Sequence, residues 1–273
     1  MKSILTFAFA APVLVSITVA AQEAAPITTD LQGDRVWLDA VAWPSPDADI
    51  FAFSLNGQRQ LHKNILLHLE IPAAVGQVSG EPAPHAAGGN VIVGMRAIGA
   101  VAPVLVVWGD LSVAVPSLYR VPATNDGIAS SSIALLAAYS REGFDVDRFY
   151  PETTFARAEF GLEGTIKRFL RYRFDISGLV GIPVGPDTTA LVPGLQSSSE
   201  FQGEFANHLY LGLRLQASGF TLSLAGGGFI GYEPPGRGFV FRIDTLVGSQ
   251  PYQVSTYVGG VFWSASTRLG YKF

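Results

Sequence analysis

Regular alternation of apolar and polar side chains is the feature that most restricts how this chain can fold. Residues 208–216 place four leucines on one face and His, Tyr, Gly, Arg and Gln on the other. Residues 64–71, 91–98 and 239–244 repeat the same period of two. This is the period of a β-strand, whose successive side chains point to opposite faces of a sheet. The sequence therefore predicts an all-β fold.

The composition indicates that these strands lie against lipid. Hydrophobic residues make up 48% of the chain and charged residues only 15%, against roughly 25% in an ordinary globular protein. After residue 21, no apolar run approaches the roughly 20 residues that a transmembrane helix needs, and the best candidate, residues 98–109, contains Pro103. Closed barrels are the other structures that satisfy their backbone within hydrocarbon. We therefore expect a closed antiparallel transmembrane β-barrel.

Segments of suitable length, separated by turn residues, predict about twelve strands, within a range of 10 to 14. They are residues 49–56, 62–72, 89–98, 103–115, 129–140, 154–165, 169–183, 205–216, 219–231, 238–248, 252–261 and 264–273. Residues 36–43 offer a further strand, and residues 184–204, rich in Pro, Gly, Ser and Thr, are expected to form an exposed loop.

The first residues resemble a secretory signal peptide. Lys2 precedes an apolar stretch that ends in Val19, Ala20 and Ala21, with the small residues that a signal peptidase accepts. An uncleaved membrane anchor is the alternative. Cleavage near Ala21 leaves residues 22–48 as a periplasmic segment or an extra strand, followed by a barrel over residues 49–273. The expected location is the outer membrane of a Gram-negative bacterium.

The last strand carries a family resemblance. Leu269, Tyr271 and Phe273 share one face of a strictly alternating segment, and the chain stops on Phe273. This resembles the terminal strand of bacterial outer-membrane barrels, which commonly ends in an aromatic residue. The resemblance implies that these three residues form an assembly signal read by the barrel-insertion machinery. It also implies contact with outer-membrane lipids and lipopolysaccharide.

A second, shorter resemblance lies at residues 89–94, where Gly89 and Asn90 precede Gly94 and an inward Arg96. The pattern resembles a strand start in a group of porin-like outer-membrane proteins, some of which are linked by name to aromatic-compound degradation. It implies solute uptake and defines no substrate.

Charged residues opposite the apolar faces are expected to line the lumen, because a charge facing lipid at the membrane midplane costs about 2–4 kcal/mol. The proposed lining and selectivity set is Arg157, Glu159, Glu163, Arg171, Arg173, Asp175, Arg214, Arg242, Asp244 and Arg268, joined by His62, His68, Glu70, Arg96 and Asp110. The densest patch is predicted where Arg171, Arg173 and Asp175 face Arg157, Glu159 and Glu163. Two interpretations stay open: a charged, water-filled constriction, or a salt-bridged interior that conducts nothing.

Other function classes find less support in the sequence. The absence of cysteine removes thiol chemistry and Cys-ligated metals, and a formal charge of −4 argues against nucleic acid. Lipid hydrolases need Ser, His and an orienting partner. Asn207 and His208 point to opposite faces of a regular strand, and no serine partner is evident for His68, which could pair with Glu70. We expect no cofactor, no metal and no catalytic residues. The favoured function is passive passage of small solutes, and the alternatives are a lipid hydrolase or deacylase, or a non-conducting structural barrel.

Overall fold

The computed structural model describes residues 33–44, 48–78, 83–117, 125–139, 145–167, 170–184, 191–206, 208–219, 223–234, 236–249 and 261–273. The proposed signal peptide, at residues 1–21, and most of the strand expected at residues 252–261 lie outside these ranges.

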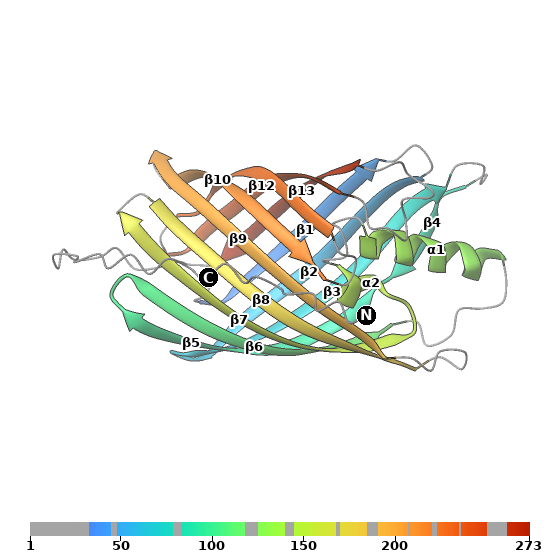
Figure 1. Cartoon of the computed structure of the whole chain (residues 1–273), viewed down its shortest axis with the longest axis horizontal. Helices are drawn as coiled ribbons and strands as arrows, with labels where there is room; N and C mark the ends of the chain where they lie inside the picture. Colours follow the sequence, from blue (N-terminus) through green and yellow to red (C-terminus); the bar gives the residue numbers. More distant parts are fainter. Residues whose placement is uncertain are drawn as a thin grey trace, which may run out of the picture.

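The described residues form one sheet that closes on itself (Figure 1). Each strand pairs antiparallel with its neighbours, and β1 pairs with both β2 and β13 to complete the ring. The elements are β1 (Arg35–Pro44), β2 (Ala48–His62), β3 (Ile65–Val78), β4 (His85–Gly88), β5 (Asn90–Ala102), β6 (Leu105–Pro116), α1 (Asn125–Tyr139), α2 (Val146–Phe149), β7 (Thr153–Lys167), β8 (Leu170–Pro183), β9 (Val192–Ala206), β10 (Leu209–Ser218), β11 (Ser223–Tyr232), β12 (Gly238–Ser249) and β13 (Val261–Lys272).

Strands β4 and β5 occupy a single place in the wall. Both pair with β3, β4 opposite Ala73–Gly76 and β5 opposite Ile65–Glu70. Gly89 separates them, and its backbone N–H donates to Pro72 O at 2.9 Å. The fold is therefore a closed antiparallel barrel of twelve strands, as the alternation predicts.

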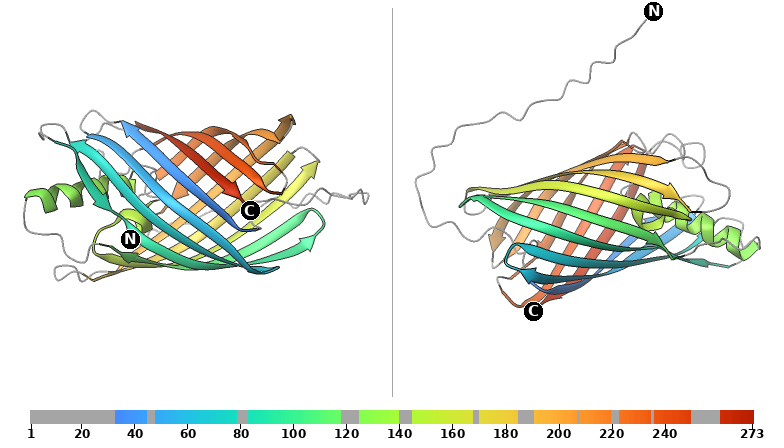
Figure 2. Two further views of the ribbon diagram at one scale, coloured as in Figure 1. Left: turned by 180° about the vertical axis from the view of Figure 1, so that it is seen from behind. Right: turned by 90° about the horizontal axis from the view of Figure 1, so that it is seen from below.

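The two ends of the barrel differ. Arg35 pairs with Lys272 across the seam, so the start of β1 and the end of β13 lie at one end, here called the terminal end. Connections at this end are short, for example residues 63–64 and 103–104. Longer connections lie at the opposite end, including the β6–β7 connection that contains α1 and α2. We call it the helical end, and α1 is seen there in Figures 1 and 2.

An apolar belt covers the outer face of the wall. On β10, Leu211, Leu213 and Leu215 are 55–67% exposed on the outer face, whereas Gln216 is buried on the inner face. The same alternation leaves apolar side chains exposed on the other strands, among them Leu38, Phe53, Leu69, Met95, Leu111, Phe160, Phe174, Leu195, Ile230, Ile243 and Leu269. A wall that is apolar outside and polar inside is suited to lipid. No helix among the described residues is long and apolar enough to cross a membrane.

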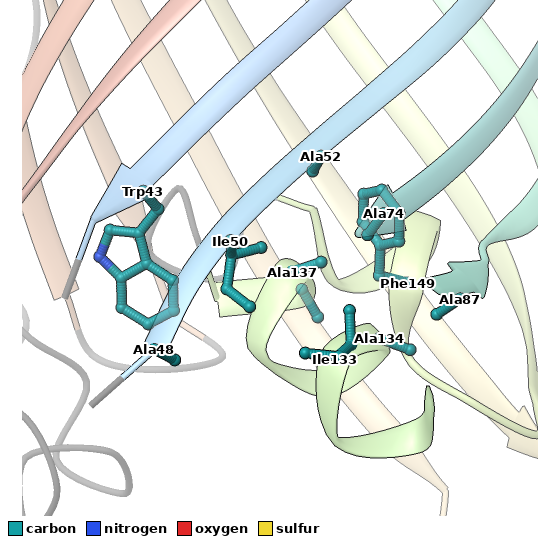
Figure 3. Close-up of a cluster of buried hydrophobic side chains, with 11 residues drawn as sticks. Trp43, Ala48, Ile50, Ala52, Ala74, Ala87, Ile133, Ala134, Ala137 and Phe149 are labelled. Carbon is teal, nitrogen blue, oxygen red and sulfur yellow. The ribbon is translucent and has the colours of Figure 1, made fainter. Parts of the chain in front are cut away.

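The expectation of a strand at residues 129–140 is wrong, because residues up to 139 belong to α1. Ile133, Ala134, Ala137 and Ala138 are almost fully buried, at the spacing of one helical face. Figure 3 shows Ile133, Ala134 and Ala137 gathered with Ile50 of β2 and neighbouring wall residues. Alanine and leucine favour a helix wherever a wall is present to bury its apolar face.

The expectation of a loop over residues 184–204 is also wrong, because β9 begins at Val192. Pro193 occupies the second residue of the strand, where the loss of a backbone donor is tolerated. Gln196 and Glu200 are buried on the inner face, whereas Leu195 and Phe201 are exposed on the outer face. The serines between them weaken the contrast between the two faces, and the strand is therefore hard to recognise in the sequence.

Strand β1 extends the barrel wall upstream of residue 49, into the segment for which the sequence leaves a periplasmic segment and an extra strand as alternatives. Its outward Val36 and Leu38 are exposed, whereas Arg35 and Val41 are buried. The wall therefore starts at Arg35, and the seam runs between β1 and β13.

Candidate functional site

A polar cavity of about 260 Å³ lies inside the barrel. It is lined from nearly all sides of the wall and from α2, by Arg35, Trp37, Asp39, Asn56, Gln58, Leu66, His68, Leu69, Glu70, Ile92, Arg96, Asp110, Ser112, Asp147, Arg148, Arg157, Glu159, Arg173, Asp175, Ser198, Glu200, Arg214, Arg242 and Arg268. The alternation along each strand brings these side chains inward, because it leaves the apolar partners for the outer face. We call this space the lumen cavity.

The most tightly paired group in the cavity wall joins three strands. Arg242 of β12 donates from Nη1 to Glu200 Oε2 at 3.0 Å and from Nη2 to Asp244 Oδ1 at 2.6 Å. Arg214 of β10 donates from Nε to the other oxygen of Glu200 at 2.6 Å. All four side chains are at most 13% exposed. This group, the β9–β12 cluster, fixes two positive and two negative charges on one side of the lumen.

A second group lies on the opposite wall. Arg96 donates from Nε to Asp110 Oδ2 at 3.0 Å, and His68 Nε2 lies 3.0 Å from the same oxygen. The imidazole crosses over β5 to reach β6, and the space is free because residue 94 is glycine: a Cβ there would collide with the His68 ring. His68 is therefore paired with Asp110 and not with Glu70, the partner that the sequence made conceivable.

The short helix α2 adds charges to the cavity from the connection between β6 and β7. Arg148 donates to Glu70 of β3 at 3.2 Å and to Asp145 at 2.6 Å. Asp147 accepts from Arg157 Nη1 at 3.2 Å. Burial opposes a charge on Arg148, but the carboxylates of Glu70 and Asp145 outweigh it and hold the pKa of Arg148 above its ordinary value. Arg148 is therefore charged throughout the physiological pH range.

Three arginines of the cavity wall stack on aromatic rings. Arg242 lies 3.8 Å from the Phe229 ring centroid, Arg173 lies 4.6 Å from Trp108, and Arg268 lies 5.8 Å from Trp37. Arg268 also donates from Nε to Asp39 Oδ1 at 2.8 Å. Stacking and pairing together hold the guanidinium groups in the wall. These three guanidinium groups consequently have defined orientations along the lumen wall.

Two small cavities lie toward the terminal end. Each has a volume of about 20 Å³, and their lining includes Arg171, Tyr172, Gln202, Glu204, Tyr210 and Glu233. At the end itself, Glu233 pairs with Arg35 at 3.4 Å and with Lys272 at 3.5 Å. These contacts hold acidic and basic side chains together at the terminal end of the interior.

The charged residues selected from the sequence occupy different parts of this interior. Arg157, Glu159, Arg173, Asp175, Arg214, Arg242 and Arg268 line the lumen cavity. Glu163 and Arg171 line the small cavity nearer the terminal end, and Asp244 is buried and accepts a hydrogen bond from Arg242. His68, Glu70, Arg96 and Asp110 also line the lumen cavity, whereas His62 is exposed at the end of β2.

Strands β7 and β8 carry the predicted face-to-face patch of charged residues. The strands are neighbours and Glu163 lies opposite Arg173 in register. Arg157 pairs with Glu159 and Asp147, Arg173 lies 3.8 Å from Asp175, and Arg171 lies 3.8 Å from Glu204 of β9. The β9–β12 cluster is a further dense group of ion pairs in the wall.

Five acidic or basic residues of the cavity are missed by the sequence analysis: Arg35, Asp39, Asp147, Arg148 and Glu200. Arg35, Asp39 and Glu200 could be found from the alternation of β1 and β9. Asp147 and Arg148 lie in a connection that folds back into the barrel, and no periodic pattern in the sequence marks it.

The three residues of the proposed assembly signal lie at the terminal end on the outer face. Leu269, Tyr271 and Phe273 are 44–62% exposed, and the rings of Tyr271 and Phe273 are 5.2 Å apart. The Phe273 N–H donates to Asp34 O at 3.0 Å. The last residue is therefore tied to the start of β1 while its side chain points outward.

The histidines do not assemble with a serine among the contacts found in the described parts of the chain. His68 is engaged with Asp110, and His208, in the turn before β10, lies 3.3 Å from Glu204. In the same described parts, no group of three His, Cys, Asp or Glu residues is placed to hold a metal ion.

Comparison with solved structures finds barrels of the same architecture. The COG4313 outer membrane channel from Pseudomonas putida F1 superposes with a TM-score of 0.57 at 7% identity, over 94% of this chain and 100% of that chain. The NanC porin gives 0.51 at 7% identity, over 87% and 98%. The KdgM porin in complex with disordered oligogalacturonate gives 0.50 at 9% identity, over 87% and 99%.

No family model matches the sequence, and no curated protein is significantly similar to it. At these identities the likeness is one of fold. The chain has the fold of the bacterial outer-membrane β-barrels, in the twelve-stranded form that resembles small porins and channels.

Proposed function

We propose that this protein is a narrow outer-membrane channel for the passive passage of small hydrophilic solutes. The observation that carries the proposal is the lumen cavity, whose wall is charged on every side while the outer face of the same strands is apolar. Charged side chains that surround an internal space keep it hydrated, and water-filled space is what a passive route requires.

The charge balance of the cavity supports weak selectivity. Its lining contains eight arginines and seven carboxylates, a formal excess of one positive charge. Many of these charges are paired with one another, as in the β9–β12 cluster, so little unbalanced field is left for a passing ion. We expect neutral polar solutes to pass, with a slight preference for anions over cations.

The dimensions support small solutes only. A volume of about 260 Å³ lies just below the range of roughly 300–1,000 Å³ typical of small-molecule sites. The KdgM porin is known in complex with oligogalacturonate, which supports a hydrophilic cargo for a barrel of this fold. It supports no particular solute for this chain.

The proposal includes a location and an orientation. Residues 1–21 act as a signal peptide that is removed, and the terminal end faces the periplasm because short turns lie there in outer-membrane barrels. Leu269, Tyr271 and Phe273 serve as the assembly signal for the insertion machinery. The belt of exposed apolar side chains contacts outer-membrane lipid and lipopolysaccharide.

Solute entry into proteoliposomes tests the function. Vesicles that contain the purified protein should admit small neutral sugars, with a rate that falls steeply as the sugar grows. Ser112→Trp places a large side chain in the lumen cavity and should lower the rate. Leu111→Trp is the matched control, because Leu111 is the adjacent residue and is 65% exposed on the lipid side. Equal rates with and without folded protein would contradict the proposal and favour a filled structural barrel. Altered masses of the vesicle lipids would favour the hydrolase.

A further inference from the structure

The break between β4 and β5 coincides with the place where α2 enters the lumen. Asn90 is the first residue of β5 and is 3% exposed on the inner face. Its side-chain Nδ2 donates to Asp147 O at 2.8 Å and to Tyr150 O at 3.1 Å, and it lies 3.5 Å from Thr153 O. One side-chain amide thus binds the main chain of α2 and of the residues that lead into β7.

Gly89 contacts the same segment through the space that it leaves. A Cβ at this position would lie 2.6 Å from Arg148 O and 2.7 Å from Pro72 Cγ. Both are closer than real Cβ contacts allow, and the first involves backbone. The residue before Asn90 must therefore be glycine for α2 to lie against the wall.

The consequence for the lumen follows from what α2 carries. Its Arg148 pairs with Glu70 and its Asp147 pairs with Arg157, and all four side chains line the lumen cavity. Beside them, Val146 is 1% exposed and packs with Ile92, Ala114, Phe155 and Leu179 of the wall. When α2 is in this place, it closes off part of the barrel interior at the helical end.

We propose that Gly89 and Asn90 form a latch that positions α2 as the constriction of the channel. This inference rests on the proposed function and names the residues that set its pore size. Glycine supplies the space for the α2 backbone and asparagine supplies the donors for its carbonyl groups. The latch gives a physical role to the Gly-Asn pair that the sequence shows before β5. Asn90 is a positioning residue, since it acts through Asp147 and Arg148 and does not itself line the lumen cavity.

Two variants break the latch by different means. Asn90→Asp keeps the size of the side chain but replaces a donor with a carboxylate that faces carbonyl oxygens. Gly89→Ala adds one methyl group where no space exists. Gly57→Ala is the matched control, because a Cβ at Gly57 of β2 meets nothing within 4 Å. The chain has no cysteine, so a single Val146→Cys substitution provides a reporter thiol in all four backgrounds.

The first readout is the rate at which a water-soluble maleimide labels the reporter in the full-length folded barrel. Ala83→Cys, at an exposed position, gives the rate for an open site. With the latch intact, labelling should be slow. Lost hydrogen bonds in Asn90→Asp and the steric clash in Gly89→Ala should each raise the open fraction of α2. The labelling rate should rise with it, by roughly tenfold or more in both latch variants. Gly57→Ala should leave the rate unchanged.

The second readout is the conductance of the same variants in a planar bilayer, which should increase when α2 is released. Unchanged labelling in Asn90→Asp and Gly89→Ala would overturn the latch. Loss of the heat-modifiable barrel in both variants would overturn it equally, because the pair would then support the wall. Faster labelling with no current in any variant would support the latch and contradict the channel, so the two proposals fail separately.

Discussion

The helical end of the barrel and its middle are stabilised by different interactions within one continuous wall. The middle, here called the waist, is the part of the wall that lines the lumen cavity. At the helical end, Ile50 and Ala74 of the wall pack with Ile133 and Ala137 of α1, and the contacts are apolar. At the waist, the β9–β12 cluster is held by hydrogen-bonded charges. Apolar packing holds α1 against the wall at one end of the barrel, whereas paired charges keep the middle polar. The charged residues of the waist therefore line the lumen, and the helices α1 and α2 lie at the helical end, where they affect access to it.

The largest effect is expected when a charge pair at the waist is broken. Arg242→Met should lower the free energy of unfolding by about 3–5 kcal/mol, because Glu200 and Asp244 lose their shared buried partner. Urea unfolding followed by gel mobility measures it. Arg171→Met is the control: the Arg171 side chain is 23% exposed and its Nη2 lies 3.8 Å from Glu204 Oε2, so a loss of about 1 kcal/mol or less is expected. Equal losses would show that the waist is not held by the cluster.

The apolar end should respond locally. Ile133→Ala removes a fully buried side chain and should weaken the docking of α1 by about 2 kcal/mol or more. Hydrogen exchange in α1 should accelerate while the unfolding midpoint of the barrel stays unchanged. Leu135→Ala on the same helix is the comparison, since Leu135 is 39% exposed and its loss should change exchange little. A lowered barrel midpoint in Ile133→Ala would mean that the two regions are not independent.

Selectivity separates the waist from the terminal end. Arg173 lines the lumen cavity, whereas Arg171 lines only the smaller cavities nearer the terminal end. Replacing Arg173 with Ser should therefore shift the reversal potential in a salt gradient toward cation preference, and by more than Arg171→Ser does. Identical reversal potentials in wild type and Arg173→Ser would place the guanidinium outside the ion path.

The smallest effect on stability is expected at the end of the chain. Phe273 is 62% exposed, so Phe273→Ala should change the unfolding free energy by no more than about 0.5 kcal/mol. If Phe273 serves in assembly, the amount of folded barrel in the membrane should fall nonetheless. Quantitative blotting of membrane and periplasmic fractions measures it, with Phe205→Ala, also outward and 54% exposed, as the control. Normal membrane levels in Phe273→Ala would remove the assembly role.

How far the sequence predicts this molecule depends on how regular each strand is. β10, with its alternating leucines, is evident from residues 208–216, and the closed all-β fold follows from such segments. β9 is obscured by serines on both faces, and residues 129–140, for which the sequence predicts a strand, contribute most of α1 instead. A helix that packs against a wall is only recognisable once the wall is known.

The same limit applies to the lumen. Arg214, Arg242 and Asp244 are predicted to point inward because their strands alternate, and their side chains lie inside the barrel. Their partner Glu200 belongs to the segment 184–204, for which the sequence predicts an exposed loop, and it lies in β9. Pairing between strands depends on their register, which places Arg214 opposite Glu200. The alternation within a single strand does not determine that register. The Arg148–Glu70 pair spans a connection that folds inward, and only the structure reveals it.

Single-channel recording of the purified wild-type protein in a planar bilayer tests the central claim most directly. The charged waist predicts discrete, small current steps that Ser112→Trp reduces and Leu111→Trp leaves unchanged. A flat record from protein that is shown by its gel mobility to be folded, with neither substitution altering it, would contradict the account and establish a barrel whose paired charges fill its interior.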